Sequence, residues 1–220
     1  MEESTGDNKI YSSGYAGSIR GAKKDDNDDF VIFYEKEPEG TVGASNVFVL
    51  TSGLTGSYHP QVSSRFAGKK ILYEYFKSHD FIEANKLALA MRNTSNEIFA
   101  YAEMQKEKMA TVVVAAAITD GKTVIGNIGN ARAYIVRNNK VYQITEDQNI
   151  LEEKVRKGEM TREEAYQADA SGPMVRTIGS EKDIVIDIYD GIDVRPGDIL
   201  LLCSSGLTTF IGKDEVLEIS

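Results

Sequence analysis

Two apolar segments of this chain end in the same four residues, and chemistry would be expected at those endings. Ser52-Gly53-Leu54-Thr55 follows one apolar run, and Ser205-Gly206-Leu207-Thr208 follows the other. A rigid scaffold holds side chains placed directly after a buried strand, so binding and catalytic groups are often found there. A metal site would need carboxylates at these positions, and the chain offers the neutral hydroxyls of Ser52 and Ser205. Ser-Gly is also a common turn signal, so a plain turn is the alternative interpretation.

A charged loop supplies the other candidate groups. It begins at Arg20 and continues through an acidic stretch, Asp25–Asp29. Arg20 could contact an anion or be a solvated loop charge. The acidic stretch could be a solvated loop, or it could hold a single ion weakly through Asp29.

Composition narrows the class of protein. The chain has 220 residues, 41% of them hydrophobic, which is enough for a sizeable core. Its net charge is −9 and its basic residues are scattered, so we expect no nucleic-acid partner. The run from Val112 to Ile118 is too short to span a bilayer, and the start of the chain lacks the apolar stretch of a secretory signal. One cysteine, Cys203, favours a buried thiol in a reducing compartment, and so a cytoplasmic protein.

The order of elements predicts an α+β fold. Residues 1–9 are expected to be disordered, and residues 10–220 to form a single domain. The pattern predicts strands and two long helices, followed by hairpins and one further helical segment. Capping-box residues suggest that the further helical segment restarts at Thr161. Val62, Phe66, Ile71 and Tyr75 follow roughly helical spacing, which supports the first long helix. The predicted helices are 60–79, 81–107, 149–168 and 213–219, and the predicted strands are 10–19, 30–34, 46–51, 110–119, 123–128, 131–137, 140–144, 184–189 and 199–204.

Seven landmarks, in fixed order over residues 14–219, resemble the metal-dependent serine/threonine phosphatases of the protein phosphatase 2C type, the PPM family. Each motif is weak alone, but their order and the elements between them are specific. The landmarks are Arg20 before Asn27-Asp28-Asp29-Phe30, Ser52-Gly53-Leu54-Thr55-Gly56, Met109-Ala110-Thr111-Val112, Gly129-Asn130-Ala131-Arg132-Ala133-Tyr134, Ile144-Thr145-Glu146-Asp147-Gln148, Val175-Arg176-Thr177-Ile178-Gly179, and Cys203-Ser204-Ser205-Gly206-Leu207-Thr208.

This resemblance implies a fold and a set of departures from the family pattern. The implied fold is a β-sandwich of two mostly antiparallel sheets flanked by helices. The family's last Asp-Asn and final strand have no counterpart, so the C-terminus is expected to be short. Ser52, Ser205 and Asn130 stand where the family has metal-binding aspartates, and Gln148 stands where it has histidine. Arg20 would be the phosphate-binding arginine, and Asp29 with Gly53 would form a vestigial, weak single-ion site.

The family reaction uses two divalent ions to activate a water that attacks the phosphoryl group. With most anionic ligands replaced, the resemblance implies a catalytically inactive member, a pseudophosphatase, with no catalytic residues and no cofactor. We expect it to act in signalling as a regulatory or scaffolding module that binds a phosphoprotein or a kinase-linked protein. The alternative is a divergent but active phosphatase that uses magnesium or manganese.

Overall fold

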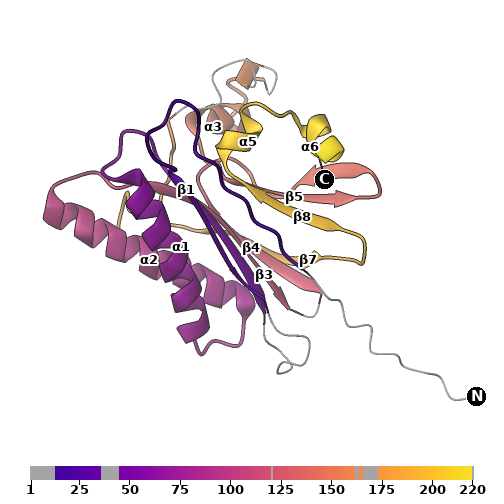
Figure 1. Cartoon of the computed structure of the whole chain (residues 1–220), viewed down its shortest axis with the longest axis horizontal. Coiled ribbons are helices and arrows are strands. Elements are labelled where there is room, and N and C mark those ends of the chain that lie inside the picture. Colours follow the sequence, from indigo (N-terminus) through magenta and orange to yellow (C-terminus); the bar gives the residue numbers. More distant parts are fainter. Residues whose placement is uncertain (1–12, 36–44, 120, 162–163, 166–172, 220) are drawn as a thin grey trace, which may run out of the picture.

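The computed structural model describes residues 13–35, 45–119, 121–161, 164–165 and 173–219. The two antiparallel sheets and flanking helices expected from the sequence are confirmed (Figure 1). One sheet has the strand order β1-β2-β3-β4-β7 and the other β6-β5-β8. The strands are β1 (Asp29–Tyr34), β2 (Asn46–Gly53), β3 (Thr111–Thr119), β4 (Lys122–Ile128), β5 (Arg132–Arg137), β6 (Lys140–Gln143), β7 (Asp187–Asp193) and β8 (Ile199–Cys203).

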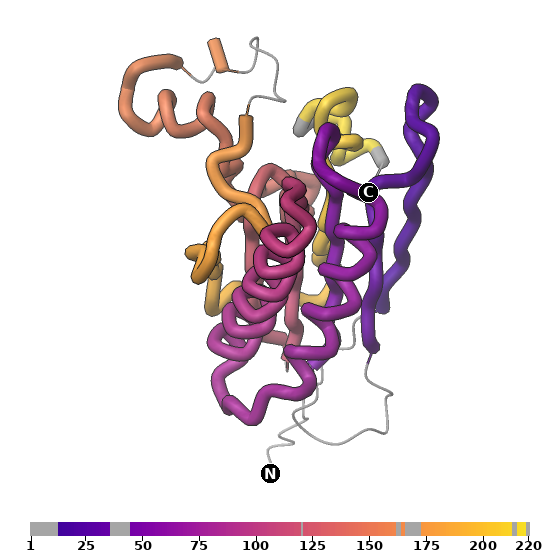
Figure 2. Tube along the Cα trace, turned by 90° about the vertical axis from the view of Figure 1, so that its left-hand side faces the viewer, coloured from indigo at the N-terminus to yellow at the C-terminus, as the bar shows by residue number. Residues whose placement is uncertain are grey.

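Two long helices cover the outer face of the larger sheet. They are α1 (Pro60–Lys77) and α2 (Glu83–Gln105), and they pack side by side (Figure 2). Three short helices follow: α3 (Ile150–Arg156), α5 (Ser205–Thr208) and α6 (Lys213–Ile219). In Figure 2, α3 stands away from the helical pair at one end of the molecule. No helix in the described part of the chain is long and apolar enough to cross a membrane.

Strand alternation divides the core into two layers. In β3, Val113, Ala115 and Ala117 pack toward α1 and α2, while the intervening Val112 and Val114 face the smaller sheet. Successive side chains of a strand point to opposite faces, so this strand is buried on both sides. It forms the centre of the structure from which the neighbouring strand ends are positioned.

The four apolar residues that follow roughly helical spacing in α1 do not share one buried face. Ile71 and Tyr75 are fully buried, but Val62 and Phe66 are 56% and 41% exposed. The buried face instead includes Ala67 and Gly68. A Cβ at Gly68 would lie 2.7 Å from the Phe30 ring, so a small residue lets α1 approach the sheet closely.

Three further differences separate the predicted elements from those of the structure. Residues 13–19, the described part of the predicted strand 10–19, form no strand. The strand predicted at 184–189 begins three residues later, at Asp187, and the short helix α5 was not predicted. The capping box is confirmed, because the backbone N–H of Glu164 donates to Thr161 Oγ1 and the backbone N–H of Thr161 donates to Glu164 Oε2. Residues 1–9, for which disorder was expected, and residues 162–163 and 166–168 of the predicted helix lie outside the described residues. The single-domain assignment stays a prediction.

Candidate functional site

Three strand ends meet at one end of the sandwich. Asp29, the first residue of β1, pairs in register with Ser52 near the end of β2. Ser204, directly after β8, donates its hydroxyl to Asp29 Oδ2 at 2.7 Å. A contact 175 positions apart in sequence therefore joins the larger sheet to the smaller one. We call Asp29, Ser52, Gly53, Ser204 and Ser205 the strand-end cluster.

Ser204 was missed by the sequence analysis, which singled out Ser205. Ser205 is the first residue of α5, whereas Ser204 precedes the helix and has extended backbone geometry. The helix changes the direction of successive side chains, so the strand alternation cannot be continued through Ser205. The sequence carried no specific signal for Ser204, because α5 was not predicted and its partner Asp29 lies in a distant element.

Close backbone packing fixes Gly53 at this end. A Cβ on this residue would lie 2.2 Å from the carbonyl oxygen of Pro60, the first residue of α1. Its backbone N–H donates to the Asp28 carbonyl at 2.9 Å. Hydroxyl contacts dock the same part of α1, since Ser63 Oγ and Thr111 Oγ1 lie 2.8 Å apart in the core. The position of the cluster is therefore set by backbone and small polar residues.

The structure does not bring Arg20 to the strand-end cluster by any described contact. Its side chain is exposed, and its guanidinium donates to the Lys24 carbonyl within its own loop. Lys24 is the cation that reaches the strand ends, since its Nζ lies 2.8 Å from Asp28 Oδ2 and 2.6 Å from Thr55 Oγ1. Lys24 was not predicted, although its position four residues before Asp28 is the usual spacing of a local ion pair.

Asn130 lies beyond the end of β4, at the same sheet edge. It is 6% exposed, and its Oδ1 has no hydrogen-bond partner among the described residues. The preceding Gly129 has φ +93°, and a Cβ there would lie 2.2 Å from Val112 Cγ1. Only glycine suits that combination of conformation and contact. Asn130 is thus held by a tight backbone bend, with no charge described beside it.

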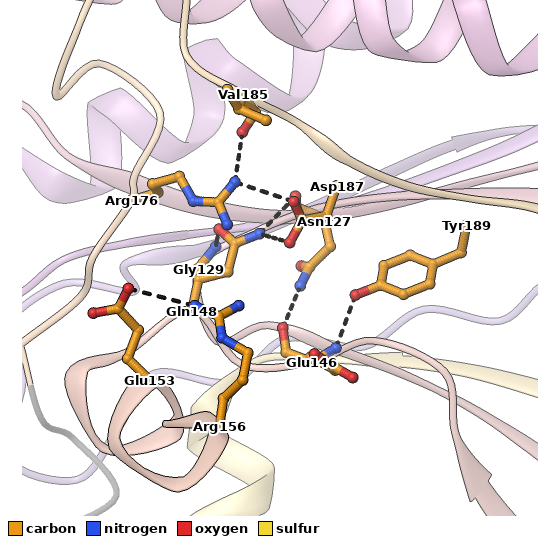
Figure 3. Close-up of polar contacts among 10 residues, drawn as sticks. All are labelled: Asn127, Gly129, Glu146, Gln148, Glu153, Arg156, Arg176, Val185, Asp187 and Tyr189. Atoms are coloured by element: carbon orange, nitrogen blue, oxygen red, sulfur yellow. Dashed lines mark hydrogen bonds and ion pairs between the residues drawn. The ribbon is translucent and has the colours of Figure 1, made fainter. Parts of the chain in front are cut away.

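Gln148 organises a second polar group, the Gln148 network, between β4, β7 and the segment before α3 (Figure 3). Its Oε1 accepts from the Gly129 N–H at 2.9 Å, and its Nε2 donates to Asp187 Oδ2 at 2.5 Å. Arg176 donates from Nη1 to Asp187 Oδ1 at 3.0 Å and to the Val185 carbonyl at 3.2 Å. Gln148 is buried, so this side chain has a hydrogen-bonding role in the scaffold.

A polar pocket of about 300 Å³ opens beside this network. Its charged walls are already paired: Arg176 contacts Asp187, and Arg156 Nη2 lies 3.4 Å from Glu153 Oε1 (Figure 3). Asp147, also in the wall, forms two hydrogen bonds of 2.7 Å with Arg132. The pocket therefore belongs to a structural polar network at the base of the segment that carries α3.

The Arg132–Asp147 pair is the strongest electrostatic contact in this region. Burial opposes the charge on Arg132, but the hydrogen bonds and the charge of Asp147 outweigh that cost and raise the pKa of Arg132. Asp147 has only 8% of its side chain exposed. The nearby Cys203 is buried as predicted, and burial raises the pKa of its thiol to about 11. It is therefore a protonated core residue at neutral pH.

The donor set of the strand-end cluster does not match a centre for two divalent ions. Across the part of the chain that the structure describes, no three His, Cys, Asp or Glu side chains gather where they could hold a metal ion. Two dications about 4 Å apart repel by roughly 16 kcal/mol at an effective dielectric of about 20. Hard cations rely on carboxylates to offset that repulsion, and the cluster contributes one, Asp29.

Sequence and structure comparisons place this fold among known proteins. No protein-family model matches the chain. It is 28% identical over 179 residues to the serine/threonine phosphatase stp of Listeria monocytogenes, covering 79% of this chain and 71% of that protein. The expected resemblance to PPM-type phosphatases is confirmed.

Solved structures agree with this conclusion. The Mycobacterium tuberculosis serine/threonine phosphatase PstP/Ppp superposes with a TM-score of 0.75 at 26% identity, over 92% of this chain and 82% of that one. A structure of the PstP catalytic domain in complex with two manganese ions has a TM-score of 0.72 at 26% identity, covering 92% and 81%. The chain therefore has the PPM-type phosphatase fold and is similar in sequence to protein phosphatase 2C-type proteins.

Proposed function

We propose that this protein phosphatase 2C-like domain is a pseudophosphatase: a regulatory or scaffolding module that recognises a phosphoprotein or kinase-linked partner without two-metal hydrolysis. The observation that carries the proposal is the Ser204–Asp29 hydrogen bond. In a two-metal centre the Asp29 carboxylate would face cations, whereas here it accepts a hydrogen bond from the neutral hydroxyl of Ser204. Ser52 and Ser205, the flanking positions, add no charge.

Loss of the metal ligands leaves the scaffold itself intact. Close packing at Gly53 and the hydroxyl contacts of α1 hold the strand ends without requiring an ion. Lys24 adds a positive charge next to Thr55, at the end of the Ser-Gly-Leu-Thr segment. A surface that keeps its shape and loses its hydrolytic ions is suited to holding a phosphorylated partner. The buried thiol of Cys203 is compatible with the reducing cytoplasm that we expect for such a module.

A divergent, active phosphatase using magnesium or manganese is the second candidate. It is favoured by the comparisons, because the relatives are named as phosphatases and one solved relative holds two manganese ions. Asp25, Asp26 and Asp28 would have to supply the missing charge. Asp28 is paired with Lys24, and Asp26 Oδ2 accepts from Gln61 Nε2 at 3.1 Å. Recruiting these carboxylates would require the loop to exchange its present contacts for metal contacts.

The deciding experiment measures manganese binding and hydrolysis on the same protein. Calorimetric titration should show no manganese binding below millimolar concentration, and p-nitrophenyl phosphate should turn over no faster with manganese than with a chelator. Manganese-dependent hydrolysis that Asp29→Ala abolishes would establish the active phosphatase instead.

A variant that places carboxylates at the two serine positions tests whether these serines are the cause of the weak manganese binding. Ser52→Asp combined with Ser205→Asp should increase manganese affinity by about a hundredfold, because two carboxylates are added at the strand ends. Ser78→Asp combined with Ser180→Asp adds the same charge outside the cluster and should leave the affinity unchanged. Equal gains in both pairs would show that net charge, and not the site, controls binding.

A further inference from the structure

Helix α1 has a second apolar face that points away from the core. Tyr73 and Phe76 are 59% and 45% exposed, in line with the exposed Val62 and Phe66. From Val62 to Phe76 the successive spacings are four, seven and three residues, which place these four side chains along one side of the helix. A surface helix normally carries one apolar stripe, directed at the core. The outer stripe of α1 is therefore available for a partner.

The outer stripe ends in a groove. It measures about 570 Å³ and is lined by Lys69, Leu72, Tyr73, Phe76 and Lys77. We call it the aromatic–lysine groove. The Phe76 ring packs edge-to-face on Tyr34 of β1, with centroids 4.8 Å apart. Tyr34 is itself 44% exposed, so the apolar surface continues from the helix onto the sheet edge.

The charge of this groove is opposite to that of the whole protein. Its lining contains two lysines and no carboxylate. Lys70 on the same helix is neutralised by Glu74 and Glu97, at 3.2 and 2.7 Å, whereas the Lys77 ammonium lies at 3.9 Å from Glu74. Lys69 has no carboxylate partner among the described residues. The groove is a basic and aromatic surface on a chain whose net charge is −9.

We infer that the aromatic–lysine groove docks an acidic segment of a protein partner, with an apolar side chain seated on Tyr73 and Phe76 and carboxylates paired with Lys69 and Lys77. Charge complementarity selects this occupant. The aromatic floor selects a peptide over a polyanion that presents only charge. The groove lies toward the C-terminal end of α1, while the N-terminal residue Pro60 packs against Gly53. Docking here is therefore separate from the strand-end cluster and independent of its chemistry.

Fluorescence anisotropy with a labelled synthetic peptide tests the inference. The probe is a peptide of about twelve residues with Leu and Phe flanked by glutamates, and its control carries lysines in place of the glutamates. The acidic peptide should bind saturably and lose affinity as salt increases, and the basic peptide should not bind. Lys69→Glu with Lys77→Glu should weaken binding by at least about tenfold. Tyr73→Ser should weaken binding by about fivefold or more.

The matched control is Lys140→Glu, at the exposed first residue of β6, which should change the affinity less than about twofold. Circular dichroism checks that the variants fold. If Tyr73→Ser does not fold, the double variant Lys69→Glu, Lys77→Glu alone tests the inference. Absence of saturable binding, or equal binding by the double-lysine variant, overturns the inference. A dimer in analytical ultracentrifugation that Tyr73→Ser dissociates would assign the groove to a second copy. Tighter binding of single-stranded DNA than of the acidic peptide would also overturn it.

Discussion

At one end of the larger sheet, the β1–β2 side and the β4–β7 side hold their polar side chains differently. On the β1–β2 side, Asp29 is the one carboxylate of the strand-end cluster and is bonded to a serine. On the β4–β7 side, Asp187 is held by both Gln148 and Arg176, with the Arg132–Asp147 pair nearby. The β1–β2 side has one carboxylate, which is hydrogen-bonded to a hydroxyl. The β4–β7 side has several charged side chains that are paired with one another. We therefore expect substitutions on the β4–β7 side to destabilise the fold more than substitutions in the strand-end cluster.

The largest expected effect comes from breaking the charged pair. Arg132→Met should lower the free energy of unfolding by about 3 kcal/mol, because Asp147 would remain buried without its partner. Urea unfolding measures this directly. Arg195→Met removes an exposed arginine paired with Asp193 and should cost no more than about 0.5 kcal/mol. Similar losses in both variants would show that the burial of the Arg132–Asp147 pair does not determine its contribution to stability.

The second-largest loss in the free energy of unfolding is expected on substitution of Gln148. Gln148→Leu keeps the volume but removes the bonds to Gly129 and Asp187, so we expect a loss of about 2 kcal/mol. Gln143→Leu is the control, because Gln143 is exposed and its side chain donates to the Thr145 carbonyl. A cost no larger than that of the control would mean that the network does not stabilise the fold.

A smaller effect is expected at the strand-end cluster. Asp29→Asn should change the stability by no more than about 1 kcal/mol, because one hydroxyl contact is exchanged for another hydrogen bond. The melting temperature of the unmodified protein should also be the same in manganese and in chelator, since ligand-linked stabilisation follows occupancy. A manganese-dependent increase that is lost in Asp29→Asn would show that the cluster is metal-bound.

The smallest effect concerns acid. Hydrogen bonds from Arg137 hold the pKa of Asp198 below its usual range. The stabilisation from this pair is complete above the ordinary Asp range and is lost as pH falls through the lower pKa of the folded state. Asp198→Asn should therefore be less stable than the unmodified protein near about pH 6, and the gap should narrow as pH falls from about 4 to about 2. A gap that widens in acid would reverse the assigned sign. Urea midpoints at several pH values provide the measurement.

The sequence was sufficient for the architecture but not for the fine placement of the site. Alternating and continuous apolar runs predicted most strands, because strand periodicity is local. Val62, Phe66, Ile71 and Tyr75 form one roughly helical series in the sequence, but Phe66 and Ile71 are five residues apart, which places the two pairs on different faces of the helix. The decisive factor was close approach at Gly68, which depends on Phe30 in another element.

The partners within the site were equally non-local. Ser204 contacts a residue from the opposite sheet, and Gln148 joins Gly129 to Asp187 across two strands. The motif positions predicted which segments would be involved, including Ser52 and Asp29, which do pair across β1 and β2. The motifs did not predict that Arg20 would bond within its own loop while Lys24 reaches Thr55.

The Ser204–Asp29 contact also has a consequence for folding during synthesis on the ribosome. Asp29 leaves the ribosome long before Ser204 is synthesised, so its carboxylate must wait in water while the strands of the larger sheet assemble. The hydrogen bond between Ser204 and Asp29, which joins the two sheets, can form only after β8 has been synthesised. A nascent chain arrested before β8 should therefore be open to proteases at the end of the sandwich that is later sealed.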